Sequence, residues 1–258
     1  MSIKFTPLSV DCSRYVIGIP VGSLSKAAWY SILRYFNPPY SMVSEMDDLI
    51  WGGTTLLLGQ DGGWQNGNRR LYIENWNCVY QFLQLNGFLL SGNQPDLQFK
   101  SVKVMNGWKW PMLGGSSSRR SDYFVFPMLT MDQSLEIFTD QACRELVDRR
   151  FQYGFTSLWS VLQQRTALDR NIQLWQTVDV SIDGNDLCRR SLDLNLIDFN
   201  LESELVGLFL PAFHSFFPDG INSFKEFMSA LGDGRISHIS AGRTNEDLPF
   251  ISFYFLIE

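Results

Sequence analysis

The segment NIQLWQTVDVSIDGNDLCRRSLDLNL, residues 171–196, alternates polar and apolar side chains along two arms that flank a turn. The first arm places Gln173, Trp175, Thr177, Asp179 and Ser181 on one face, and Leu174, Val178, Val180 and Ile182 on the other. After the turn Asp183-Gly184-Asn185, Arg189, Ser191, Asp193 and Asn195 oppose Arg190, Leu192, Leu194 and Leu196. This pattern predicts an antiparallel hairpin with one polar and one apolar face.

Helical and strand-like stretches alternate on both sides of this hairpin. Helical periodicity and stop signals predict helices at 23–36, 76–85, 131–150 continuing, after a break near Tyr153-Gly154, to about 169, and further helices at 202–216 and 223–231,. Further strands are expected at 15–20, 54–58, 69–73, 97–105, 122–126, 235–240 and 250–257,. The connection GWKWPMLGGSSSRR, residues 107–120, is the best candidate for a mobile loop,.

This order of elements predicts one α+β domain spanning residues 1–258. Strands joined by short turns pair antiparallel, and each helix must bury an apolar stripe against them. The polar strand face then meets solvent if the sheet is open, or lines a lumen if the sheet closes. Closure is favoured because it removes exposed strand edges.

Charge and composition exclude several classes of function. The net charge is −6, and basic residues occur in doublets such as Arg69-Arg70 and not in runs, which disfavours nucleic-acid binding,. No stretch approaches the length of a membrane span, and the N-terminal residues lack the pattern of a signal peptide, so we expect a cytoplasmic protein,. Four separated cysteines and two histidines make a zinc cluster improbable,.

Short strand motifs add a family resemblance. The closing hairpin, ISHISAGR (236–243) followed by LPFISFYF (248–255), resembles the last strand pair of the ABBA (prenyltransferase-barrel) aromatic prenyltransferases. Arg70-Leu71-Tyr72, a basic residue near an aromatic one on a strand, is similar to the same family. The resemblance implies an antiparallel β-barrel of repeated helix–strand–strand units with helices outside. It also implies transfer of a prenyl group from an allylic diphosphate to an electron-rich acceptor in specialised metabolism.

Such a reaction requires three kinds of side chain. Cations must bind the diphosphate, and strand position suggests Arg70, Lys103, Arg189 and Arg235,. Aromatic rings must shield the allylic cation, and the candidates are Tyr72, Tyr123, Trp175 and Tyr254,. A carboxylate must orient the acceptor and remove its proton, and the candidates are Asp179, Asp193 and Glu74,. Surface charge, packing and cross-strand ion pairs remain open as ordinary roles for these residues.

The expected ligands follow from the same resemblance. The substrates would be an allylic diphosphate and a small-molecule or peptide acceptor, with neither nucleic acid nor membrane as a partner. No cofactor is expected to be required. Asp47-Asp48 is an isolated acidic pair, so Mg2+, if used, would be held mainly by the diphosphate,.

Two alternatives to an enzyme stay open. A non-catalytic barrel that binds an apolar small molecule would show an aromatic cavity without clustered Arg and Lys. An accessory protein would bind another protein through an open polar sheet face, with Trp108, Trp110 and Trp175 as interface anchors,.

Overall fold

Helices and antiparallel strands alternate along the computed structural model, which describes residues 1–6, 9–62, 67–87, 100–112, 118–146, 149–168, 175–181, 191–216, 221–244 and 247–257. The chain divides into two units. Unit 1 comprises Met1–Cys12, Met128–Val178 and Arg189–Glu258, and unit 2 comprises Ser13–Pro127 and Asp179–Cys188. Each unit has its own hydrophobic core.

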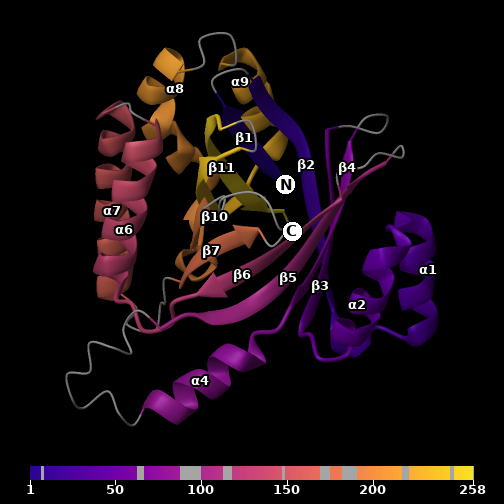
Figure 1. Ribbon diagram of the computed structural model, residues 1–258. Helices are drawn as coiled ribbons and strands as arrows, with labels where there is room; N and C mark the ends of the chain where they lie inside the picture. The colour runs from indigo at the N-terminus through magenta and orange to yellow at the C-terminus, as the bar shows by residue number, and fades with distance from the viewer. Residues whose placement is uncertain are drawn as a thin grey trace. The chain divides into compact units, whose positions relative to one another are not determined.

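Unit 2 is built on neighbouring antiparallel strands that follow one another in chain order. Its elements are β2 (Ser9–Pro20, which begins in unit 1), η1 (Val21–Ser23), α1 (Lys26–Phe36), α2 (Tyr40–Ile50), β3 (Thr55–Asp61), β4 (Asn68–Glu74), α4 (Asn77–Gly87), β5 (Val102–Pro111) and β6 (Arg119–Val125). Each strand pairs with the next, from β2 through β3, β4 and β5 to β6. Helices α1 and α2 lie beside each other next to these strands (Figure 1).

The core of unit 2 lies between these two helices and one face of the sheet. Trp29, Met46 and Ile50 of the helices are buried against alternate residues of β3, β4 and β5, which are Leu56, Leu58, Leu71, Ile73, Trp108 and Trp110. The residues between them therefore point to the opposite face, because successive strand side chains alternate.

Local signals set the ends of α1 and α2. Ser25 caps the start of α1 by accepting a hydrogen bond from the Ala28 backbone N–H at 3.1 Å,. Asn37, with φ of 46°, ends α1 in the left-handed conformation that asparagine tolerates,. The Pro38-Pro39 pair then separates α1 from α2, because proline cannot continue the preceding helix,.

Unit 1 combines a second group of antiparallel strands with most of the helices. Its elements are β1 (Ser2–Thr6), α6 (Met131–Leu146), α7 (Arg149–Leu168), β7 (Trp175–Ser181, which runs into unit 2), β8 (Ser191–Asn195), η3 (Ile197–Phe199), β9 (Leu201–Glu202), η4 (Ser203–Phe209), α8 (Leu210–Phe216), α9 (Ile221–Leu231), β10 (Arg235–Arg243) and β11 (Pro249–Leu256). Strand β11 pairs with β1 and β10, and β10 also pairs with β8 and β9.

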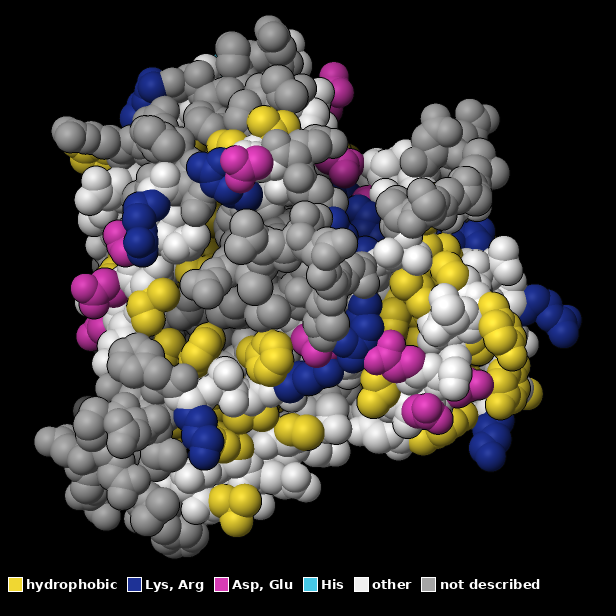
Figure 2. Space-filling view, in the orientation of Figure 1, with side chains coloured by type: hydrophobic (Ala, Val, Ile, Leu, Met, Phe, Trp, Pro, Cys, Tyr) yellow, Lys and Arg dark blue, Asp and Glu magenta, His cyan; other side chains and the backbone are white. Residues whose placement is uncertain are grey.

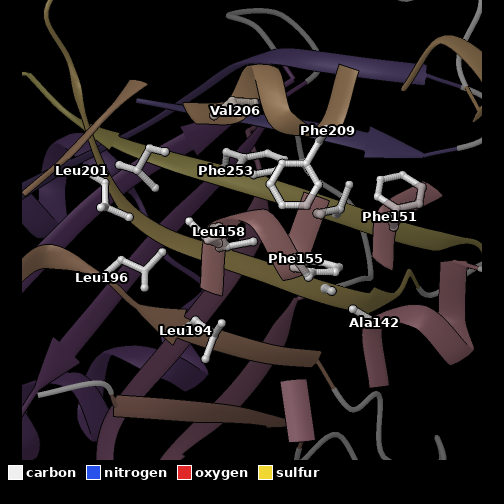
Figure 3. Packing of buried hydrophobic residues seen from close by; sticks show 14 of the residues in the cluster. Ala142, Phe151, Phe155, Leu158, Leu194, Leu196, Leu201, Val206, Phe209 and Phe253 are labelled. Atoms are coloured by element: carbon white, nitrogen blue, oxygen red, sulfur yellow. The ribbon is translucent and has the colours of Figure 1, made fainter. Parts of the chain in front are cut away.

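Aromatic packing dominates the core of unit 1. Figure 3 shows Phe151 and Phe155 of α7, Phe209 of η4 and Phe253 of β11 among the residues of this core. The rings of Phe155 and Phe209 are 5.0 Å apart, and those of Phe209 and Phe253 are 5.3 Å apart, both within the range of favourable aromatic pairs,. The helices thus cover the apolar strand face, and the polar face is left on the other side.

The predicted succession of helix–strand–strand units is confirmed, but strands β1 and β9 were not predicted from the sequence. Helix–strand–strand recurs as α1/α2–β3–β4, α4–β5–β6, α6/α7–β7–β8 and α8/α9–β10–β11. Helix α2 was not predicted from the sequence, although Met46 and Ile50 have the four-residue spacing of a buried helix face,. The start of the helix predicted at 202–216 is instead the 3-10 helix η4, which follows β9.

The prediction of a mobile loop at 107–120 is wrong at both ends. Strand β5 continues to Pro111, because Trp108 and Trp110 alternate toward the core of unit 2. Strand β6 already begins at Arg119. Residues 113–117 lie outside the described part of the chain. Among the described helices, none has both the length and the apolar character needed to cross a bilayer.

Candidate functional site

The polar face of unit 2, meaning the face of β2–β6 that points away from α1 and α2, carries a row of chemically useful side chains. Arg70, Tyr72 and Glu74 alternate along β4 on this face. Cross-strand register places Lys109, Gly107 and Met105 of β5 beside them in the same order. On β6, Arg119, Ser121 and Tyr123 are the next neighbours of those three residues.

Basic side chains surround one carboxylate at the end of this face. Asp61, the last residue of β3, forms ion pairs with the Arg70 guanidinium and with Lys109 Nζ, the latter at 3.1 Å. Both cations contact the same oxygen, Oδ2, whereas Oδ1 accepts a hydrogen bond from the Asn68 backbone N–H at 3.2 Å. Arg14 of β2, which is buried, is near enough to lower the pKa of Lys109. We call Arg14, Asp61, Arg70 and Lys109 the cation cluster.

The protonation behaviour of the cation cluster follows from burial and neighbouring charge. Burial alone would raise the pKa of Asp61, but Arg70 and Lys109 hold it well below its usual value,. Burial, aided by Arg70 and Arg14, lowers the pKa of Lys109 to about 8, against the opposing effect of Asp61. The cluster therefore carries three positive charges and one negative charge near neutral pH, a net positive charge that would attract a polyanion,.

Two tyrosines lie next to the cation cluster on the same face. The rings of Tyr72 and Tyr123 meet edge to face with their centroids 5.9 Å apart. Gly107 lies between them on β5, and a Cβ there would come within 2.7 Å of Tyr72 and 3.0 Å of Tyr123. The glycine thus permits the close approach of both rings. The Tyr72 hydroxyl also accepts a hydrogen bond from Arg70 Nη1 at 3.2 Å, which links the pair to the cluster.

Glu74 follows Tyr72 on the polar face of unit 2. Burial raises the pKa of its carboxyl group, although hydrogen bonds with Trp76 and Thr55 oppose the shift. A carboxyl group with a raised pKa is suited to accept a proton near neutral pH. Arg70 of the cation cluster, Tyr72 of the aromatic pair and Glu74 thus follow one another along β4.

Lys103 is not part of this arrangement. A bulge between Lys103 and Met105 in β5 reverses the alternation of side chains,. Lys103 therefore lies on the other face of the sheet, where its Nζ is 2.7 Å from Asp122 Oδ1. Arg120 joins the same network through Asp122 at 3.3 Å and Glu45 of α2 at 2.6 Å. The prediction that Lys103 accompanies Arg70 is corrected, and Lys109 takes that place.

Trp108 and Trp110 are not exposed interface anchors, contrary to the alternative raised from the sequence. They are 1% and 2% exposed, and their ring N–H groups donate to Glu45 Oε2 and to the Phe36 carbonyl oxygen. Hydrophobic side chains visible over α1 and α2 in Figure 2 belong to a different part of unit 2. The exposed aromatic residues of this region are Tyr30, Tyr35, Tyr40 and Trp51.

Unit 1 has a polar strand face of its own, with three predicted site residues on its strands. Asp193 of β8 lies opposite Ser240 of β10. Tyr254 of β11 pairs with His238 of β10, with ring centroids 6.2 Å apart, and burial lowers the pKa of His238 to about 4. Arg235 lies at the start of β10, 3.6 Å from Glu202 of β9.

The remaining predicted site residues fall where no side chain is described. Trp175 and Asp179 lie on β7, for which the structure describes only the backbone. Arg189 lies outside the described residues. Within the described ranges, no group of three or more His, Cys, Asp and Glu side chains is positioned to hold a metal ion.

Sequence reasoning missed Arg14, Asp61, Lys109 and Arg119. Lys109 and Arg119 lie in the segment interpreted as a loop, where the alternation of Trp108 and Trp110 with Lys109 was the available signal. Asp61 stands just beyond the strand predicted at 54–58. No local pattern indicates that Arg14 and Asp61 approach, because their strands pair through long-range register.

Comparison with solved structures identifies the fold. AnaPT from Neosartorya fischeri superposes with a TM-score of 0.52 at 14% identity, over 99% of this chain and 76% of that protein. The 5-dimethylallyl tryptophan synthase from Streptomyces coelicolor, solved in complex with DMASPP and Trp, also gives a TM-score of 0.52 at 14% identity, over 99% and 77%. The chain has the prenyltransferase-barrel fold. No protein-family model and no curated protein matches the sequence. The predicted α+β class, an antiparallel barrel of helix–strand–strand units with helices outside, is thereby confirmed at the level of fold.

Proposed function

We propose that this protein transfers a prenyl group from an allylic diphosphate to an aromatic or other electron-rich acceptor, as part of specialised metabolism. The observation that carries the proposal is the order in which three kinds of side chain follow one another along the polar face of unit 2. The cation cluster is followed by the Tyr72–Tyr123 pair and then by Glu74. The prenyltransferase-barrel fold supports the same reaction.

In the proposed reaction, Arg14, Arg70 and Lys109 bind the diphosphate oxygens. Their charge stabilises the leaving diphosphate as the allylic C–O bond breaks and its electron pair moves to the diphosphate oxygen. The Tyr72 and Tyr123 rings then stabilise the allylic cation through their π faces and keep water away from it. Substrate phosphates would compete with Asp61 for the same two cations.

The second half of the reaction forms the new bond. A carbon or heteroatom of the acceptor attacks the cation, and the acceptor then loses a proton to a nearby base. Glu74 is the proposed base, because burial raises the pKa of its carboxyl group. Roles for Asp179, Asp193, Arg189, Arg235, Trp175 and Tyr254 stay predictions, as do the identity of a small-molecule or peptide acceptor and a contribution of Mg2+ through the diphosphate.

The alternatives fit the observations less well. A carrier of an apolar molecule does not need Arg14, Arg70 and Lys109 on one face, since an apolar ligand has no charge for them to bind,. A protein–protein interface anchored by Trp108 and Trp110 conflicts with their burial.

A matched pair of lysine variants tests the proposal. Lys109→Ala and Lys103→Ala each remove a β5 lysine that is paired with an aspartate, but from opposite faces of the sheet. Isothermal titration with dimethylallyl and geranyl S-thiolodiphosphate, with and without Mg2+, should show a Kd at least about tenfold weaker for Lys109→Ala, since a charge-assisted hydrogen bond contributes about 1.5–3 kcal/mol. Lys103→Ala should bind as the wild type does.

Two results would contradict the proposal. A wild type that binds neither analogue would lack the central requirement of the reaction. Equal weakening by both lysine variants would show that general charge, and not the polar face of unit 2, attracts the diphosphate.

A further inference from the structure

Asp61 is fixed in its position by the backbone around it. It ends β3, directly before Gly62, which has a φ of 78°. The Gly62 backbone N–H donates to Ser13 Oγ at 3.1 Å, and the Asn68 backbone N–H donates to Asp61 Oδ1. The carboxylate therefore cannot withdraw far from the cations without losing its hydrogen bond from the Asn68 backbone N–H.

Asp61 Oδ2 already accepts hydrogen bonds from the cationic donors that a diphosphate oxygen would need. The Arg70 guanidinium and Lys109 Nζ both converge on this one oxygen. Asp61 is 6% exposed, so its interaction with the two cations is poorly screened by water,. A carboxylate oxygen with two cationic donors has the same local environment as an oxygen of a bound phosphate.

We propose that Asp61 is an internal counter-anion that occupies the cation cluster while no diphosphate is bound and weakens diphosphate binding by competing for Arg70 and Lys109. This inference rests on the proposed function, because it assigns a role within the same site. Asp61 is thus a positioning residue: it holds the two cations in place before the substrate arrives. It also assists departure of the diphosphate product by re-forming both ion pairs.

The charges that act on Lys109 give this role a pH signature. Arg14 of β2 and Arg70 of β4 lower the pKa of Lys109, whereas Asp61 of β3 raises it. Arg119 of β6 lies opposite Lys109 on the same face. Removing the Asp61 charge would therefore lower the pKa of Lys109 below about 8, so that Lys109 loses its proton at a lower pH,. Diphosphate binding should decline at a correspondingly lower pH.

The experiment compares the wild type with Asp61→Asn, Asp61→Glu and the matched control Asp122→Asn. Asp122 is also a buried strand aspartate paired with a lysine, but it lies on the opposite face of the sheet. Inorganic pyrophosphate and dimethylallyl S-thiolodiphosphate are titrated into each protein from roughly pH 6 to roughly pH 9, a range that includes the pKa of Lys109,.

At the acidic end, Asp61→Asn should bind both ligands about tenfold more tightly than the wild type, because a nearby repulsive charge has been removed. Its affinity should then fall at a lower pH than that of the wild type. Asp61→Glu retains the charge and should restore the wild-type pH profile. Asp122→Asn should leave affinity and pH profile unchanged.

Loss of stability in Asp61→Asn is tested through its melting temperature. The variant leaves the cations without their carboxylate, so pyrophosphate should raise its melting temperature more than that of the wild type. A variant that is unfolded alone should be recovered by pyrophosphate.

The outcomes separate this inference from the proposed function. Wild-type protein that binds neither ligand overturns both. The counter-anion role alone is overturned if the wild type binds the ligands and Asp61→Asn binds them with equal or weaker affinity at the acidic end of the pH range. Failure of pyrophosphate to recover an unfolded Asp61→Asn variant also overturns it.

Discussion

Gly107→Ala should destabilise unit 2 by forcing the two tyrosines apart. The new Cβ would lie 2.7 Å from Tyr72 Cδ1, 2.9 Å from Tyr72 Cε1 and 3.0 Å from Tyr123 Cε2. Overpacking of this kind costs about 1–3 kcal/mol, and disturbing the ring pair adds about 0.5–1.5 kcal/mol. Replacing a strand glycine by alanine returns about 0.5–1 kcal/mol. The net loss should lie between about 0.5 and about 4 kcal/mol.

Urea unfolding monitored by tryptophan fluorescence measures this loss. Gly22→Ala is the control, because a Cβ at Gly22 would meet nothing within 4 Å. Tyr72→Phe should not relieve the cost of Gly107→Ala, since the contacting atoms are ring carbons. Tyr72→Ala should relieve most of it in a double-mutant cycle. Under the proposed function, Gly107→Ala should also slow prenyl transfer more than it weakens diphosphate binding.

The reasoning is refuted if Gly107→Ala is as stable as the wild type. It is also refuted if the cost is the same with and without the Tyr72 ring, because the contact would then have no part in it.

Three further predictions concern unit 1. Gly154→Ala should lower the free energy of unfolding by about 1–3 kcal/mol, because its Cβ would lie 2.4 Å from the Phe209 ring; urea unfolding checks it, and wild-type stability would contradict it,. Phe253→Ala should cost about 3–5 kcal/mol by the same measurement, because this fully buried ring packs against Phe209; a cost below about 1 kcal/mol would contradict the packing,. The pKa of His238 is lowered to about 4, so between this value and 6.5 the unfolded chain takes up a proton that the folded chain refuses. Stability should therefore fall by up to roughly 3 kcal/mol as the pH drops through that window, and His238→Gln should lessen the fall.

The architecture could be predicted because it depends on local periodicity. The alternation of Leu71 and Ile73 with Arg70, Tyr72 and Glu74 fixes which face of β4 is polar, and the structure agrees. The same rule fails on β5, where the bulge between Lys103 and Met105 changes the face without any mark in the sequence. The alternation of side chains thus predicts the face of a residue reliably only along a strand without a bulge.

The site could be predicted only in part, because its centre is assembled by pairing between strands. Arg70, Tyr72, Tyr123 and Glu74 were all proposed from the sequence. Asp61 was missed because a carboxylate at a strand end has no special local signal. The role of Asp61 depends on its ion pair with Lys109, which forms across β4 because β3, β4 and β5 are paired in this register.

The pairing of β1 with β11 has a consequence for how the protein is made. Ile3 lies opposite Phe253, so unit 1 joins segments from distant parts of the chain, whereas most of unit 2 is the continuous stretch Ser13–Pro127. On the ribosome, that stretch emerges complete long before β11 does, so β1 cannot complete its strand pairing until β11 follows. Chains stalled in between would expose the Phe-rich surface that β11 normally covers, and nascent-chain chaperones would be expected to bind there.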